Sequence, residues 1–116
     1  LQVLNEATVL VNVTNDAWFG DSTARHQHLQ ISRMRALEAG RPLIRAANDG
    51  ISGILDAQGD VQTQLPSFET AVLTGVIRPR TGLTPYARLG NWLVILLACG
   101  AVIGSLPIVN ARLRKQ

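Results

Sequence analysis

The longest uncharged stretch of the chain constrains its fold more than any other feature. It runs from Leu89 to Ala111, 23 residues without an acidic or basic side chain, and Arg88 and Arg112 flank it. A helix of that length spans about 35 Å, more than the hydrocarbon core of a bilayer, which is about 30 Å thick. Trp92 lies near one end, where an aromatic ring would reach the lipid headgroups. The run predicts a transmembrane helix over 89–111, and the alternative is a buried helix of a soluble domain.

Charge is distributed unevenly around this run. All eight acidic residues lie at or before Glu69, whereas five arginines and one lysine follow it without any acid. Such an asymmetry indicates that the basic part contacts a membrane or a polyanion. Because the basic residues are sparse and flank an apolar run, we expect a bilayer as partner and no nucleic acid. The basic tail 112–116 is expected to be cytoplasmic, on the spacing of its charges.

The region before residue 89 predicts an α/β fold. Short apolar and β-branched stretches, separated by turn sequences such as Asn48-Asp49-Gly50, predict five strands. They are 8–13, 41–47, 51–55, 61–65 and 71–77. A strand-helix-strand start of this kind normally belongs to a larger layered sheet, so residues 1–80 are expected to form only part of a domain. Residues 81–88 are the predicted linker to the apolar run.

One helix is predicted between the first two strands. Asp21 or Ser22 can cap its start. The apolar residues Ile31, Met34 and Leu37 recur along it every three residues, and Leu29 and Ala36 widen this stripe. A glycine followed by a proline, at 40 and 42, predicts its end at Ala39.

Spacing alone reveals no catalytic set. Cys99 is the only cysteine, and it lies in the middle of the apolar run, where a thiolate is disfavoured and no base is near, so it is expected to be a packing residue. His26 and His28 are two residues apart on a predicted helix and cannot form the i, i+4 metal pair. No phosphate-binding or dinucleotide-binding glycine pattern is present, and we expect neither a metal nor a cofactor.

Three segments in order carry a resemblance to a known family. They are VNVTNDAWFG at 11–20, HLQISRMRALEAGRPLIRAANDGISGILDAQGDV at 28–61, and TGLTPYARLGNW at 81–92. Together they resemble the nitrilase (carbon–nitrogen hydrolase) superfamily, and within it the C-terminal portion of the bacterial apolipoprotein N-acyltransferases. The resemblance implies an α/β fold, part of a nitrilase-like αββα sandwich, followed by one C-terminal transmembrane helix in the bacterial inner membrane, with the soluble part facing the periplasm.

The activity implied by this resemblance is acyl transfer through a thioester. The donor is a phospholipid, and the acceptor is the N-terminal amine of a diacylglyceryl-cysteine lipoprotein. The family uses a Glu–Lys–Cys triad, in which Cys is the nucleophile, Glu the general base, and Lys stabilises the oxyanion. The nucleophile's motif stands upstream of NDAWFG in the family, and nothing before Asn15 matches it. The resemblance therefore implies that this chain lacks the triad, is inactive alone, and needs the upstream part of the same enzyme as its partner.

The resemblance also implies roles for residues near the NDAWFG turn, which would follow a strand at the sheet end where α/β active sites open. The expected substrate-binding residues are Asn15, Asp16, Trp18 and Phe19. Residues expected to support them from behind are His28, Arg35, Glu38 and Asn48. For Trp18, an equally weighted alternative is a structural plug at the sheet end. For Arg35 and Glu38, a purely structural ion pair is equally plausible.

Two other functions fit the same sequence. One is a membrane-tethered nitrilase-like amidase that hydrolyses a small amide. The other is a non-catalytic, tail-anchored module that binds a partner through its basic linker. The second alternative predicts that residues 1–80 fold alone, whereas the acyltransferase interpretation predicts that unpaired strand edges and an uncovered helix face prevent it.

Overall fold

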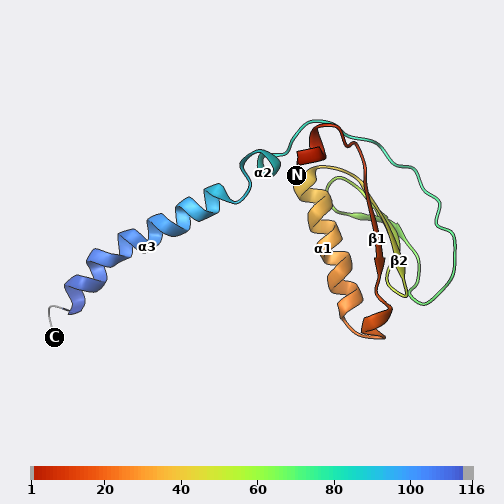
Figure 1. Cartoon of the computed structure of the whole chain (residues 1–116), viewed down its shortest axis with the longest axis horizontal. Coiled ribbons are helices and arrows are strands. Elements are labelled where there is room, and N and C mark those ends of the chain that lie inside the picture. The colour runs from red at the N-terminus through yellow and green to blue at the C-terminus, as the bar shows by residue number, and fades with distance from the viewer. Residues whose placement is uncertain (1, 114–116) are drawn as a thin grey trace.

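The computed structural model describes the backbone of residues 2–113 and the side chains of residues 4–105. Figure 1 shows a helix, α1, lying along one side of a small sheet, while a long helix, α3, extends away from both. In chain order the elements are η1 (Gln2–Asn5), β1 (Leu10–Asn15), η2 (Ala17–Phe19), α1 (Ala24–Ala39), β2 (Leu43–Asn48), β3 (Gly53–Leu55), β4 (Val61–Gln64), α2 (Pro85–Leu89) and α3 (Trp92–Leu113).

The sheet is mixed, with the strand order β1-β2-β3-β4. β1 and β2 are parallel, in a register that pairs Leu10 with Leu43 and Asn15 with Asn48. Parallel neighbours need a crossover, and α1 supplies it. β2, β3 and β4 follow as an antiparallel meander. The predicted strand-helix-strand start followed by a meander is confirmed, with the observed strands two residues or less from the predicted starts.

Helix α1 ends where the sequence predicts. Gly40 adopts the left-handed conformation, with φ of 63°, and its N–H group bonds to the carbonyl oxygens of Ala36 and Leu37. Glycine adopts this conformation without strain, so it is the usual residue just after a helix. A Cβ at this position would also press on Thr84, which reaches back from the start of α2.

The buried face of α1 includes Ala36 and the partly buried Leu29 from the predicted apolar stripe, but not the other three residues of that stripe. Ile31, Met34 and Leu37, whose spacing predicts the helix, are exposed, and the buried residues are Ser32, Ala36 and Ala39. The reason is that small side chains let the helix lie close to the sheet. The core between them consists of Ala36, Leu43 and Leu55, with Leu10, Leu29 and Val61 packed against it.

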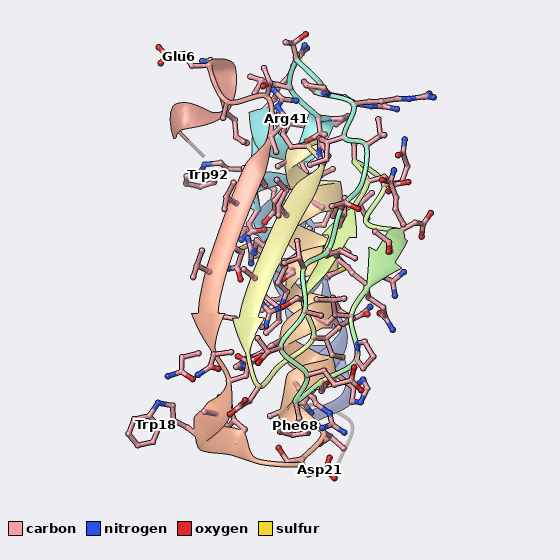
Figure 2. The ribbon with its side chains drawn as sticks, turned by 90° about the vertical axis from the view of Figure 1, so that its right-hand side faces the viewer. Glu6, Trp18, Asp21, Arg41, Phe68 and Trp92 are labelled. Atoms are coloured by element: carbon pink, nitrogen blue, oxygen red, sulfur yellow. The ribbon has the colours of Figure 1, made fainter. Side chains whose placement is uncertain are left out.

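The prediction of a strand at 71–77 is wrong. This segment is extended but makes no strand, and Figure 2 shows it crossing in front of the sheet, on the face opposite α1. Gly75 lies so close to Ile54 that a Cβ there would stand 2.6 Å from the Ile54 Cδ1 atom. Because the segment lies across the face of the sheet and not along an edge strand, its backbone has no ladder to join.

The predicted linker contains a short helix of its own. Thr84 caps α2 by accepting a hydrogen bond from the N–H group of Ala87 at 3.0 Å, and Pro85 occupies the first turn, where a missing N–H group costs nothing. Gly90, with φ of 56°, then separates α2 from α3. The single helix predicted over 89–111 therefore differs from the structure at its start, because Leu89 ends α2 and α3 begins at Trp92.

None of the helices, as far as the structure describes them, combines the length and the apolar character that a membrane crossing requires. The side chains of residues 106–111, which belong to the predicted transmembrane helix, lie outside the described residues. The same holds for the predicted basic tail at 112–116, of which only the first two backbone positions are described, as the end of α3.

Candidate functional site

A buried carboxylate stands at the point where β1 ends. Asp16 is only 2% exposed and accepts three hydrogen bonds. Its Oδ2 atom accepts from Nη2 of Arg45 at 2.8 Å, and its Oδ1 atom accepts from Nδ1 of His28 at 2.9 Å and from the Thr14 hydroxyl at 3.2 Å. These donors come from β2, α1 and β1, so one carboxylate ties three elements together.

The surroundings of Asp16 keep it ionised. Burial on its own would raise the pKa of the Asp16 carboxyl, because an ion is less stable away from water. The hydrogen bond from His28, the positive charge of Arg45 and the hydrogen bond from Thr14 outweigh that effect. The pKa of Asp16 therefore lies below its ordinary value of 3.8.

Arg45, on β2, holds the Asp16 carboxylate in place. It is 4% exposed, and it donates from Nε to the Ile51 carbonyl at 3.1 Å and from Nη1 to Asn12 at 2.9 Å and Ser32 at 3.0 Å. Lysine could not replace it, because only the planar guanidinium presents donors in several fixed directions. The end of the sheet beneath the NDAWFG turn is therefore rigid.

Hydrogen bonds of Asn15, Asp16 and Asn48 hold the turn itself. The side-chain oxygen of Asn15 accepts from the Ala17 N–H group at 3.1 Å and from the side chain of Asn48 at 3.3 Å, and the N–H group of Asp16 donates to the Asn48 carbonyl at 3.0 Å. Gly50 lies against the Asp16 carboxylate, and a Cβ at this position would overlap it. The turn after β1 and the Asn48-Asp49-Gly50 turn after β2 therefore form one unit.

The two aromatic side chains of the turn lie in different surroundings. Phe19 packs edge to face against the imidazole of His28, with ring centroids 5.0 Å apart. Trp18 is 85% exposed, and Figure 2 shows it projecting from the end of the sheet. The turn presents an unsupported tryptophan on a firmly held backbone.

Beside this turn, a cavity of about 410 Å³ opens at the carboxyl ends of β1 and β2. Its apolar lining includes Val13, Ala46 and Phe68, and its polar lining includes Asn48, Asp49 and Glu69. Ligands of open α/β sheets bind at this position, outside the carboxyl ends of parallel strands. Of the eight residues expected to form or support the site, only Asn48 lines the cavity.

The structure brings six of those eight residues together. Asn15, Asp16, Trp18 and Phe19 form the turn, and His28 and Asn48 contact it. Arg35 and Glu38 lie about two helical turns further along α1 and pair with each other, with 2.7 Å between Nη1 and Oε2. None of the described hydrogen bonds or ion pairs joins those two residues to the turn.

Sequence reasoning missed Arg45 and Gly50 as parts of the site. The sequence contained a signal for Arg45, which is a single arginine within an apolar strand. An arginine is almost never buried without a partner, so its position predicts a buried ion pair or hydrogen-bonded group. The cluster positions the turn; its carboxylate is occupied by three donors and is not free to react. Within the described residues, no three His, Cys, Asp or Glu side chains are arranged to hold a metal ion.

Comparisons with known proteins identify the family of the chain. A sequence model of the carbon-nitrogen hydrolase family matches residues 2–86. The apolipoprotein N-acyltransferase of Methylococcus capsulatus is 56% identical over 113 residues, which are 97% of this chain and 22% of that protein. The protein of the same name from Photobacterium profundum is 43% identical over 107 residues, 92% of this chain and 21% of that protein. The protein of the same name from Haemophilus influenzae is 58% identical over 82 residues, 71% of this chain and 16% of that protein. The chain spans about a fifth of the length of these curated relatives.

Proposed function

Because the chain belongs to the carbon–nitrogen hydrolase family and matches apolipoprotein N-acyltransferases over most of its length, we propose that it is part of such an acyltransferase. The proposed enzyme moves an acyl chain from a phospholipid to the N-terminal amine of a diacylglyceryl-cysteine lipoprotein. Within this chain, the NDAWFG turn is the observation that locates the proposed site. It holds a highly exposed tryptophan on a rigid frame, at the sheet end where α/β sites open.

The proposed chemistry has two steps. A cysteine thiolate attacks an ester carbonyl of the phospholipid, the carbon–oxygen bond breaks, and a lysophospholipid leaves with a proton while a thioester forms. The amine of the lipoprotein then attacks the thioester, which forms an amide and returns the thiol. The only cysteine of this chain, Cys99, has no acidic or basic residue within four positions on α3. The proposal therefore places the Glu–Lys–Cys triad in the rest of the enzyme and makes this chain inactive alone.

The proposed role of this chain is to form a wall of the acyl-transfer site. A binding surface that is already rigid loses little conformational entropy when a ligand arrives, and the buried Asp16–Arg45 pair provides that rigidity. Trp18 and Phe19 offer apolar surface to an acyl chain, whereas Asn15 and Asp16 hold the turn. His28 and Asn48 support it through their contacts with Asp16 and Asn15.

The proposal also assigns α3 and its flanking residues to the inner membrane. The uncharged run at 89–111 supports a spanning helix. The proposed orientation, with a cytoplasmic C-terminus and a periplasmic α/β part, follows the basic residues close behind the run and the family resemblance. Large apolar side chains of α3 are exposed along its described length, which suits contact with lipid. They include Val94, Leu96, Val102 and Ile103.

Trp18→Ala in the full-length membrane enzyme tests the function and the site together. An alkyne-tagged phospholipid and a diacylglyceryl-cysteine peptide serve as donor and acceptor, and gel analysis separates thioester formation from transfer. We expect thioester formation to slow about tenfold, equivalent to about 1.4 kcal/mol of lost apolar contact, with membrane insertion unchanged. Val72→Ala, at a residue that is also exposed but lies on the 71–77 segment, is the control and should have no effect.

The outcomes separate the two parts of the proposal. If the wild-type enzyme forms no thioester and labels no peptide, the acyltransferase assignment is wrong. If the wild-type enzyme is active and Trp18→Ala matches it in both steps, the turn is not part of the site, and Trp18 only packs against the rest of the enzyme.

A further inference from the structure

Phe68 occupies an unusual backbone conformation at the same end of the sheet as the NDAWFG turn. Its φ angle is 65°, in the left-handed region, which a bulky residue rarely enters and which costs about 1–3 kcal/mol. Among the described residues other than glycine, only Asp49 also has a positive φ, and aspartate tolerates this conformation better than phenylalanine does. Figure 2 shows Phe68 at the end of the molecule where Trp18 and Asp21 also lie.

Burial does not compensate for this strain. The Phe68 side chain is 52% exposed, so its position gains only part of the free energy that a phenylalanine gains in a core. The ring is nevertheless held in place, because the guanidinium of Arg25 lies 5.1 Å from its centroid. Arg25 is fixed in turn by an ion pair with Asp21, 2.6 Å between Nη2 and Oδ1. The contact with Arg25 restrains the aromatic ring and leaves about half of its surface exposed.

Phe68 belongs to the wall of the cavity at the carboxyl ends of β1 and β2, and it also lines a smaller cavity of about 310 Å³ beside Arg25. Phe68 lines the larger cavity together with the apolar Val13 and Ala46, and the polar lining includes Asn48 and Glu69. A volume of about 410 Å³ lies within the usual range of ligand sites. A cavity lined by both apolar and polar groups fits a ligand that joins a hydrocarbon chain to a polar group.

We propose that Phe68 is a specificity-determining residue that contacts the acyl chain of the phospholipid donor. This inference rests on the proposed acyltransferase function and adds to it a residue about 50 positions beyond the NDAWFG turn. Asp49 and Glu69 are the charged residues of the cavity lining, and their carboxylates disfavour the donor's phosphate there. The apolar chain and its ester therefore enter the cavity, and the headgroup stays outside.

The test compares phospholipids that share one headgroup and carry short, medium or long saturated acyl chains. Full-length wild-type enzyme and its Phe68→Ala variant are offered the donors in pairs, and the ratio of kcat/KM for long over short chains is read from the transferred products. We expect Phe68→Ala to change this ratio about tenfold, the size of effect that one or two methylene contacts produce. Phe68→Tyr keeps the ring and should keep the wild-type ratio.

A second variant guards against a folding defect. Phe68→Gly removes the ring and also relieves the backbone strain at φ of 65°, so it should be at least as stable as Phe68→Ala and lose the same discrimination. Val72→Ala is again the control for removal of an exposed apolar side chain. If wild-type enzyme transfers acyl chains and both ring-deleting variants keep its length profile, the inference is wrong and the proposed function stands. If wild-type enzyme transfers none, the proposed function fails, and the inference fails with it.

Discussion

Replacing Asp16 by asparagine removes one charge of a buried ion pair and keeps the shape of the side chain. Asp16 and Arg45 are both almost fully buried, with 2.8 Å between Oδ2 and Nη2. The other partners of the Arg45 guanidinium, on Ile51, Asn12 and Ser32, are neutral. The variant therefore leaves a buried cation without a counter-ion, which costs about 3–5 kcal/mol.

The magnitude is large enough to measure in the full-length enzyme. For a cooperative unit of about 150–250 residues, each kcal/mol lowers Tm by about 2–4 °C, so Asp16→Asn should lower it by about 6–20 °C. Tryptophan fluorescence during heating in detergent reports the transition. The matched control is Asp60→Asn, which removes the same charge from an arginine pair on the surface, at 3.5 Å from Arg33 and with the Asp60 side chain 75% exposed. Such a surface pair contributes at most about 1 kcal/mol.

The pH dependence of this difference has a definite sign. The folded-state pKa of Asp16 lies below its ordinary value of 3.8, so the stability it contributes is complete above that value and is lost as the pH falls through the lowered folded-state pKa. The Tm difference between wild type and Asp16→Asn should stay constant near neutral pH and shrink only below about pH 4, where wild type also becomes protonated. Equal Tm values at neutral pH, or an effect no larger than that of Asp60→Asn, would refute the structural role of the pair.

Two further predictions concern the connection to α3 and α3 itself. Arg41 is buried and donates to the carbonyl oxygens of Ala7 at 2.7 Å, Leu4 at 2.9 Å and Gly82 at 2.7 Å. Because lysine cannot reach all three, Arg41→Lys should lower the free energy of unfolding by about 2–4 kcal/mol and expose the chain near Gly82 to limited proteolysis. A wild-type cleavage pattern would contradict this. Cys99 is exposed on α3. If α3 spans the bilayer, a water-soluble maleimide should label Cys99 in detergent but not in proteoliposomes. Fast labelling of Cys99 in sealed vesicles would place α3 outside the membrane.

The order of elements could be predicted because local signals specify it. Gly40 and the Asn48-Asp49-Gly50 turn mark the ends of α1 and β2, and both occur where expected. Hydrophobicity predicted the buried face of α1 only in part, because the contact with the sheet selects small volume, which buries the polar Ser32 and leaves larger apolar residues exposed. The 71–77 segment has the composition of a strand, but a strand also needs an edge to pair with, and composition does not reveal that.

The candidate site was predictable only in part, for the same reason. The NDAWFG motif identifies the turn, and its neighbour Asn48 follows from the parallel pairing of β1 and β2. Arg45 lies 29 residues from Asp16 in the chain, and Phe68 reaches the cavity through a left-handed turn. Their roles depend on contacts between distant segments, which no local pattern in the sequence encodes.

A photo-cross-linking residue placed at position 18 of the full-length enzyme measures directly whether the turn contacts the acyl chain. The enzyme is illuminated in vesicles that contain a phospholipid with an alkyne at the end of its acyl chain, and the same residue at position 72 serves as the equally exposed control. If the carboxyl end of the β1–β2 pair is the acyl-transfer site, position 18 forms the lipid adduct and position 72 does not. Equal labelling at the two positions, or labelling at 72 alone, would contradict that placement of the site.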